Sequence, residues 1–363
     1  MNKKYLVALF LFLIIGLFMI SEDKHEAPSK PMVKIGVIAP LTGDVSYLGE
    51  LYVKAVKLAV SEAENKNLKY DYELTIEDDA LETKKTALAY NKLVHVDKVN
   101  ALISFTAGSG NVVSPLTQMD QIPHFGITSD PIVAKGEYNF VHWTQPDKEA
   151  IEFVKEANRR GIKNIAVVAL KHPGAYAIMN ALKAEIKNSD LKITSLDYVI
   201  PGTRDFKTII LKAEEKNPDA YFLQFYPPEI NVAYKQLREL GINAQVTGME
   251  ILAILSDEDK KLFEGAWNVD SAEASEEFKK LYKEKTGNNV GIGTPNAFDA
   301  VNILIKANEE IGDGFKIPNP KNIAYYISNL KNYDSVLGNI SIDENSIFQS
   351  QAVVKEIKDG KYN

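Results

Sequence analysis

Polar side chains follow the short apolar runs of this sequence, where they could hold a small molecule. In the first half of the chain these loops are small, hydroxylated and rich in glycine. Such loops expose backbone N–H groups at the start of a helix, which suit a carboxylate or another acceptor. Loops in the second half carry rings and an acid instead. The two sets predict a site for a small zwitterion or a polar amide, with the candidate residues Thr106, Gly108, Ser109, Gly110, Thr128, Ser129, Tyr176, Tyr226 and Glu250.

The alternative interpretation of each small polar residue is a plain helix cap or strand end. Other chemistry has weaker support. The glycines at 108 and 110 lack the third glycine of a dinucleotide fingerprint, and those at 291 and 293 follow no strand. The sequence contains neither a GxSxG elbow nor a Walker loop. We expect the acidic cluster Glu77, Asp78 and Asp79 to be a solvated turn, and His124 to be a packing residue within a strand.

The composition excludes several classes of protein. No cysteine occurs among the 363 residues, so no disulfide, iron–sulfur cluster or thiol catalyst can form on this chain. The five histidines show no helical metal-ligand spacing. A net charge of −7 argues against non-specific binding to nucleic acid, which needs a basic surface. We therefore expect no metal site, no cofactor, no catalytic residue and no nucleic-acid partner.

The first thirty residues are typical of an export segment rather than of a folded domain. Lys3 and Lys4 precede an uncharged apolar run at residues 5–20, and acidic residues follow it. As a helix the run would extend about 24 Å, somewhat short of a ~30 Å hydrocarbon core. Because no small-x-small cleavage motif follows residue 20, we slightly favour an uncleaved membrane anchor over a cleaved signal. The body of the chain is then expected to lie outside the cytoplasm.

After residue 32 the chain alternates apolar β-branched runs with amphipathic stretches, which predicts a mainly parallel α/β architecture. Its length favours about two domains, and the pattern restarts near residue 149, so we predict two doubly wound lobes. The alternative is a single barrel of eight βα units, but the alternation fails after about residue 250. The expected strands are 33–40, 73–80, 100–105, 122–127, 164–170, 192–200, 220–226 and 244–249, with a β-ribbon at the end. The expected helices are 48–64, 83–96, 114–120, 149–161, 175–188, 205–217, 228–241, 275–287, 297–312 and 322–330.

Five segments carry a resemblance to a known family: IGVIAPLTGDVSYLGE (35–50), IEDDALETKKTALAYNKLV (76–94), IPHFGITSD (122–130), YPPE (226–229) and GME (248–250). In their order and spacing, the chain resembles the leucine/isoleucine/valine-binding family of solute-binding proteins of ABC importers, over about residues 32–358. The resemblance implies the type I periplasmic binding protein fold, in which two Rossmann-like lobes are joined by a three-crossing hinge.

By that resemblance the hinge crossings fall near residues 142–147, 266–270 and 336–340. The first lobe would comprise residues 32–145 and 270–337. The second lobe would comprise residues 146–269 and 338–363. Residues 1–30 would form the signal or anchor and a short linker.

The resemblance also assigns roles to single residues. It implies that a ligand carboxylate is received by the loop Thr106, Ala107, Gly108 and Ser109. Thr128 and Asp130 then hold the ammonium group together with Glu250, and Tyr176 and Tyr226 supply rings. The chain departs from the family pattern in three places: Ala107 stands where a serine is common, Asp130 where a threonine is expected, and Leu48 (beside Tyr47) where an aromatic ring is expected.

The expected function is capture of a small amino-acid-like or amide ligand by hinge closure, followed by delivery to ABC permease subunits without chemical change. The first alternative is a ligand-sensing extracellular domain that signals to a membrane partner. The second is an exported enzyme that uses Glu250 and Asp130 as paired carboxylates.

Overall fold

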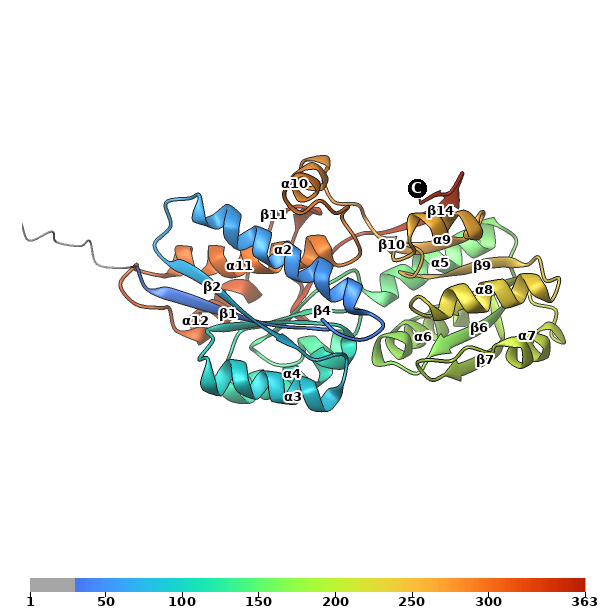
Figure 1. The fold of residues 1–363 in the computed structure, drawn as a ribbon, viewed down its shortest axis with the longest axis horizontal. Helices are drawn as coiled ribbons and strands as arrows, with labels where there is room; N and C mark the ends of the chain where they lie inside the picture. The colour runs from blue at the N-terminus through green and yellow to red at the C-terminus, as the bar shows by residue number, and fades with distance from the viewer. Residues whose placement is uncertain (1–29, 363) are drawn as a thin grey trace, which may run out of the picture.

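The computed structural model describes residues 30–362, and these form two α/β lobes that lie side by side (Figure 1). The predicted export segment at residues 5–20 lies outside the described residues. Within residues 30–362, no helix is both long enough and apolar enough to span a bilayer. Two separate sheets replace the single barrel that we considered as the alternative.

The first lobe is built on a six-stranded parallel sheet with the order β13-β5-β4-β3-β1-β2. One face packs on α2, α10, α11 and α12, and the other face packs on α3 and α4. The strands are β1 (Met32–Ala39), β2 (Asp71–Asp78), β3 (Ala101–Phe105), β4 (His124–Ile127), β5 (Asn139–His142) and β13 (Ile347–Phe348). The helices are α2 (Ser46–Glu64), α3 (Thr83–Asn91), α4 (Ala107–Asp120), α10 (Glu276–Thr286), α11 (Thr294–Ile311) and α12 (Pro320–Ser328). A short hairpin, β11 (Tyr333–Ser335) with β12 (Gly338–Ile340), completes the lobe.

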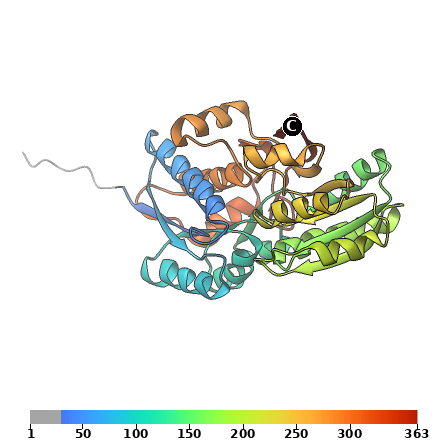
Figure 2. The ribbon, with the colours of Figure 1, turned by 45° about the vertical axis from the view of Figure 1, so that its right-hand side comes forward.

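The second lobe is built on a seven-stranded sheet with the order β15-β14-β10-β9-β8-β6-β7, in which β14 and β15 run antiparallel. Helices cover both of its faces, as the turned view shows (Figure 2). The strands are β6 (Asn164–Leu170), β7 (Lys192–Val199), β8 (Ala220–Gln224), β9 (Gln245–Met249), β10 (Trp267–Ser271), β14 (Ala352–Lys358) and β15 (Lys361–Tyr362). The helices are α5 (Pro146–Arg159), α6 (Pro173–Glu185), α7 (Lys207–Glu214), α8 (Glu229–Glu239) and α9 (Asp257–Lys260).

Strand β6 shows why the sequence forms this layered structure. All but its first residue are apolar and buried. Because successive side chains point to opposite faces of a sheet, Ile165 and Val167 pack with α5 and α6, while Ala166 and Val168 pack with α7 and α8. A continuous apolar run is therefore the expected sequence of a central parallel strand with helices on both sides.

The helix α4 begins seven residues earlier than the sequence pattern predicted. Its first turn is formed by the glycine-rich loop, which we had expected to be irregular. Glycine is unfavourable within a helix, but here it permits close packing. A Cβ on Gly110 would lie 2.8 Å from a methyl group of Val133. The segment 131–134 can therefore pack directly on α4.

Three crossings connect the lobes, and hydroxyl groups join all three. The Oγ1 atom of Thr144, between β5 and α5, lies 2.7 Å from Ser271 Oγ at the end of β10. It also lies 2.8 Å from Ser350 Oγ, between β13 and β14. The expectation that the third crossing falls at 336–340 is wrong, because those residues form the β11–β12 hairpin and the following β13 pairs with β5. The chain thus stays in the first lobe through Phe348.

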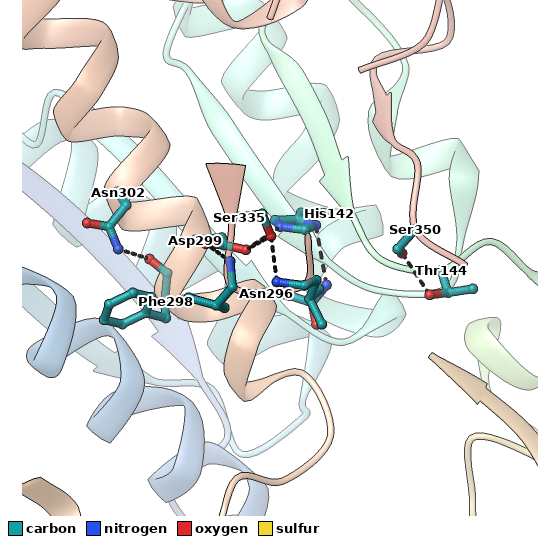
Figure 3. Close-up of polar contacts among 10 residues, drawn as sticks. His142, Thr144, Asn296, Phe298, Asp299, Asn302, Ser335 and Ser350 are labelled. Carbon is teal, nitrogen blue, oxygen red and sulfur yellow. Dashed lines mark hydrogen bonds and ion pairs between the residues drawn. The ribbon is translucent and has the colours of Figure 1, made fainter. Parts of the chain in front are cut away.

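A buried polar network fixes the first-lobe side of the hinge (Figure 3). His142 is the last residue of β5, and its Nε2 atom lies 3.4 Å from Asp299 Oδ2 on α11. The Nδ1 atom of His142 lies 3.3 Å from the side-chain amide of Asn296, and Ser335 Oγ donates to the same Asp299 carboxylate. Because His142 is held by α11, it belongs to the first lobe, and the segment that crosses to the second lobe begins at Trp143.

Candidate functional site

A cavity of about 60 Å³ lies between the lobes, at the carboxyl ends of the parallel strands of both sheets. This is the position at which open α/β sheets bind ligands. No lysine or arginine is present among the residues that line it. The lining residues from the first lobe and its crossing are Leu48, Tyr52, Thr106, Ala107, Ile127, Thr128, Ser129, Trp143 and Ile292. From the second lobe they are Leu170, His172, Gly174, Ala175, Ile178, Gln224, Phe225, Tyr226, Glu250, Ile251 and Ile254.

The first-lobe wall is the N-terminus of α4. Thr106 caps this helix, and its Oγ1 accepts the backbone N–H of Ser109 at 3.4 Å. The N–H groups of Ala107 and Gly108 belong to the first helical turn, in which no intrahelical acceptor exists. Since Thr106 and Ala107 both line the cavity, this helix end can receive a carboxylate or an amide oxygen.

Ser109 points away from the cavity, contrary to the expectation of a hydroxyl contact with the ligand. Its Oγ donates to Asp79 Oδ2, and Thr86 Oγ1 donates to the same oxygen at 3.0 Å. Asp79 is fully buried, so the prediction of a solvated acidic turn is wrong for this residue. Asp79 instead ties α3 to the start of α4.

Asp130 also lies outside the cavity. Its carboxylate accepts the backbone N–H of Ile132 at 3.2 Å and the side-chain amide of Asn111 at 3.0 Å. Thr128 does line the cavity, and its Oγ1 accepts the backbone N–H of Asp130 at 3.1 Å. The paired carboxylates of the enzyme hypothesis, Asp130 and Glu250, are therefore not brought together around this space.

Tyr176 lies outside the cavity too, where it is 41% exposed and packs edge-on against Tyr198. His172, which sequence reasoning missed, borders the cavity in this loop. It caps α6, because its Nδ1 accepts the N–H of Gly174 at 3.2 Å. Burial lowers the pKa of His172 to about 4, so the ring is neutral at pH 7 with its hydrogen on Nε2. The only feature of the sequence that could have indicated this role is the position of His172 just before a proline at the start of a helix.

The Nε2 atom of His172 faces the first lobe. A Cβ on Gly108 would lie 3.3 Å from this nitrogen. Gly108 is therefore at the contact between the lobes, although it does not line the cavity itself. A neutral histidine that points an N–H at a helix N-terminus places a further donor on this side of the space.

Aromatic rings form the middle of the cavity. Tyr52, one turn after Leu48 on α2, stacks on Phe105 at a centroid distance of 4.3 Å and supplies the ring that was expected near Leu48. Tyr226 meets the His172 ring edge-on at 6.2 Å. Burial raises the pKa of Tyr226 to about 12, and the nearby Glu250 charge adds to this effect. Both tyrosines remain neutral hydrogen-bonding groups at physiological pH.

Glu250 is the one carboxylate of the cavity wall. It follows β9 in a left-handed conformation (φ +63°) and is 8% exposed. Its Oε1 accepts the indole N–H of Trp143 from the hinge crossing. Burial raises the pKa of Glu250 to about 8, while the bond from Trp143 opposes this shift. A cationic group of a ligand would favour the ionised form.

Nothing in the described chain resembles a metal centre. Among residues 30–362 no group of three or more histidine and acidic side chains could hold a metal ion. The cavity offers hydrogen-bonding groups, rings and a single carboxylate.

Comparison with known proteins agrees with this fold. The family model described as periplasmic binding protein matches residues 32–361. The Leu/Ile/Val-binding protein BraC3 of Rhizobium johnstonii is 25% identical over 88% of this chain and 90% of its own length. The leucine-, isoleucine-, valine-, threonine- and alanine-binding protein of Pseudomonas aeruginosa is 24% identical over 86% of each chain.

Solved structures show the same two-lobed architecture. A leucine-binding protein from Thermotoga maritima superimposes with a TM-score of 0.81, at 23% identity over 91% of this chain and 97% of that one. A solute-binding protein from Rhodopseudomonas palustris in complex with benzoate superimposes with a TM-score of 0.82, at 15% identity over 92% of this chain and 95% of that one. The chain belongs to the periplasmic binding protein family, and the predicted two-lobed fold and family resemblance are confirmed.

Proposed function

We propose that this protein is the extracytoplasmic solute-binding component of an ABC importer. It captures a small ligand of the amino-acid or amide class between its lobes, and hinge closure completes the site. The ligand leaves chemically unchanged. The observation that carries the proposal is the cavity between the lobes, with a helix N-terminus on one side and Glu250 on the other.

The two ends of the cavity suit the two ends of an amino acid. The first turn of α4 and the N–H of His172 would receive the carboxylate or a carbonyl oxygen. Glu250 would receive the ammonium group, with Thr128 and Tyr226 beside it. The apolar walls, which include Leu48, would then hold the side chain. Exclusion of water on closure strengthens each of these polar contacts.

The relatives support this class of ligand without settling its identity. Two of them are named as binding proteins for leucine, isoleucine and valine, and one structural neighbour was solved with benzoate. An aromatic carboxylate could use the end of α4, but it has no cationic group to pair with Glu250 and to favour its ionised form. The cavity therefore favours an amine or amide over a simple aromatic acid.

Delivery to a permease and attachment to the membrane complete the proposal. The apolar segment at residues 5–20 would hold the protein at the outer face of the membrane. An ABC permease would then recognise the closed form, whose population ligand binding increases.

A thermal-shift screen tests the ligand class. The full chain is incubated with amino acids, short amides and aromatic carboxylates, and we expect stabilisation by a member of the first two sets. Calorimetry should then give one site per chain, and small-angle scattering should show a decrease in radius of gyration on binding. Turnover of the ligand, or no stabilisation by any of these compounds, would contradict the proposal.

A further inference from the structure

A second buried acid lies behind Glu250, and the ligand contacts proposed above do not use it. Glu149 is in the first turn of α5 and is fully buried. Neither of its carboxyl oxygens accepts a hydrogen bond from any donor in the described chain. An ionised carboxylate in this position would be very costly, because it would have lost water without gaining a donor.

The neighbours of Glu149 are mostly acidic. Its carboxyl group lies within hydrogen-bonding reach of the Glu250 carboxyl group and close to Asp270 on β10. Asp147, which lies on the same helix α5, adds a further negative charge that disfavours ionisation of Glu149. Burial first, and then these charges, raise the pKa of Glu149 well above its usual value.

Asp270 has donors of its own, unlike Glu149. The hydroxyl of Tyr362 and the backbone N–H of Ser271 each donate to it at 2.7 Å. Burial raises the pKa of Asp270, while these two donors and the charge of Lys355 on β14 oppose the shift. Asp270 is therefore better equipped than Glu149 to be ionised, and a charge on Asp270 opposes a charge on Glu149.

Two carboxyl groups in contact within a dry site cannot both be ionised, so one of them keeps its proton. Glu250 already accepts the indole N–H of Trp143, which favours its ionised form. Glu149 has no such donor. The proton therefore belongs on Glu149, and Glu250 is the acceptor within its reach.

We propose that Glu149 is a positioning residue of the ligand site, a neutral carboxylic acid whose O–H donates to Glu250, orients it and favours the ionised form that Glu250 would take when a cationic group binds. This deepens the proposed function and relies on it for the identity of the ligand. The contact itself lies within the second lobe, since both residues belong to elements around the second sheet. It therefore exists in the absence of ligand.

The test follows the indole N–H of Trp143 by NMR in the ligand-free full chain labelled with ¹⁵N-tryptophan. The chain contains two tryptophans, so Trp267→Phe assigns the signals. The Trp143 signal should titrate with the ionisation of Glu250. Glu149→Leu removes the donor to the charged form and should move this midpoint upward by about one pH unit. Glu149→Gln keeps a donor and should leave the midpoint near that of the wild type.

An ionised Glu149 would give the opposite result. It would raise the pKa of Glu250 by repulsion, so both variants would then lower the midpoint. A lower midpoint in either variant, or no change with Glu149→Leu, overturns the proposal. Glu152→Gln, one turn further along α5 and away from this cluster, is the matched control and should not shift the signal. Thermal melts verify that each variant is folded.

A ligand is not needed for this titration, so its outcome is separate from that of the ligand screen. If the screen succeeds with an amino acid, Glu149→Leu should weaken its binding about tenfold at pH 7, and Glu149→Gln should restore it. If the screen fails while the midpoint still rises, the proposed function fails and the role of Glu149 stands.

Discussion

Two residues at opposite sides of the cavity have strained backbones. Thr106 has φ +78° and Glu250 has φ +63°, although positive φ is unfavourable for residues with a side chain. Such strain persists where the surrounding structure holds a residue in place, and it occurs often at binding sites. In the proposed site, Thr106 starts the helix that would face an acceptor, and Glu250 would face a cation. The strain therefore coincides with the two polar ends of the proposed site.

Removal of the Glu250 carboxylate is the most direct test of that site. Glu250→Ala should weaken the binding of an amine-bearing ligand by about 1.5–3 kcal/mol, because a charged hydrogen bond is lost. Isothermal calorimetry measures the change. Asp130→Asn is the control, since Asp130 lies outside the cavity and should leave affinity unchanged. Equal affinities for Glu250→Ala and the wild type, with an intact fold, would remove Glu250 from the site.

His172 and Tyr176 give opposite expectations although they lie in the same loop. His172→Phe removes the N–H that faces α4 and should reduce ligand affinity by about 0.5–1.5 kcal/mol. Tyr176→Ala should have no effect, because the ring is directed away from the cavity. Calorimetry on both variants shows whether His172 or Tyr176 contributes to ligand affinity. A loss confined to Tyr176→Ala would mean that the family-based assignment of this residue is right.

At the scale of the elements, closure depends on how near the ends of α4 and α6 can approach. A Cβ on Gly174 would lie 3.2 Å from Ser129 Oγ and 3.6 Å from the Cβ of Ala107. Helix α6 thus meets the first lobe through a residue without a side chain. The absence of a Cβ would let the two helix ends close around a small ligand, as the proposed function requires.

A larger residue at this contact should hold the lobes apart. Gly174→Val places two methyl groups against Ser129 and Ala107, so we expect weaker ligand binding and a radius of gyration that no longer decreases with ligand. Lys183→Val, on an exposed position of the same helix, is the control for a β-branched substitution. Normal compaction of Gly174→Val in small-angle scattering would show that the lobes meet elsewhere.

The hydroxyl cluster of the hinge makes a separate prediction at this scale. Thr144→Val keeps the shape of the side chain but leaves Ser271 and Ser350 without their shared partner. We expect a loss of about 1–2 kcal/mol in the free energy of unfolding, measured with urea. Thr203→Val, which removes an exposed hydroxyl group, should cost much less. Similar losses in the two variants would mean that the cluster adds nothing special to the hinge.

At the scale of the whole molecule, the buried acids should affect how the stability of the fold depends on pH. Glu250 has a pKa of about 8 in the folded chain, against 4.5 as its usual value. The folded state therefore binds more protons between these pH values, and the contribution of this group to stability is lost as pH rises toward 8. The melting temperature of wild-type protein should fall relative to that of Glu250→Gln between pH 5 and 9. A constant difference between the two curves would contradict the raised pKa.

Much of the architecture could be predicted from local pattern. Apolar runs such as 164–170 and amphipathic stretches between them indicated a parallel α/β chain, and the restart of that pattern indicated two lobes. Strands β5 and β10 were missed as strands, because four or five residues with polar members show no clear period. The third crossing was misplaced because the pairing of β13 with β5 joins residues some two hundred positions apart.

The sequence by itself determined which loops meet at the site, since loops at the carboxyl ends of parallel strands converge on the same edge of a sheet. Thr106, Thr128, Ser129, Tyr226 and Glu250 were identified in this way and do border the cavity, as does Ala107, which the family resemblance added. Only the tertiary structure decided which way each side chain of those loops turns. Ser109 turns to Asp79, Tyr176 turns outward and His172 turns inward, because partners distant in sequence compete for each side chain.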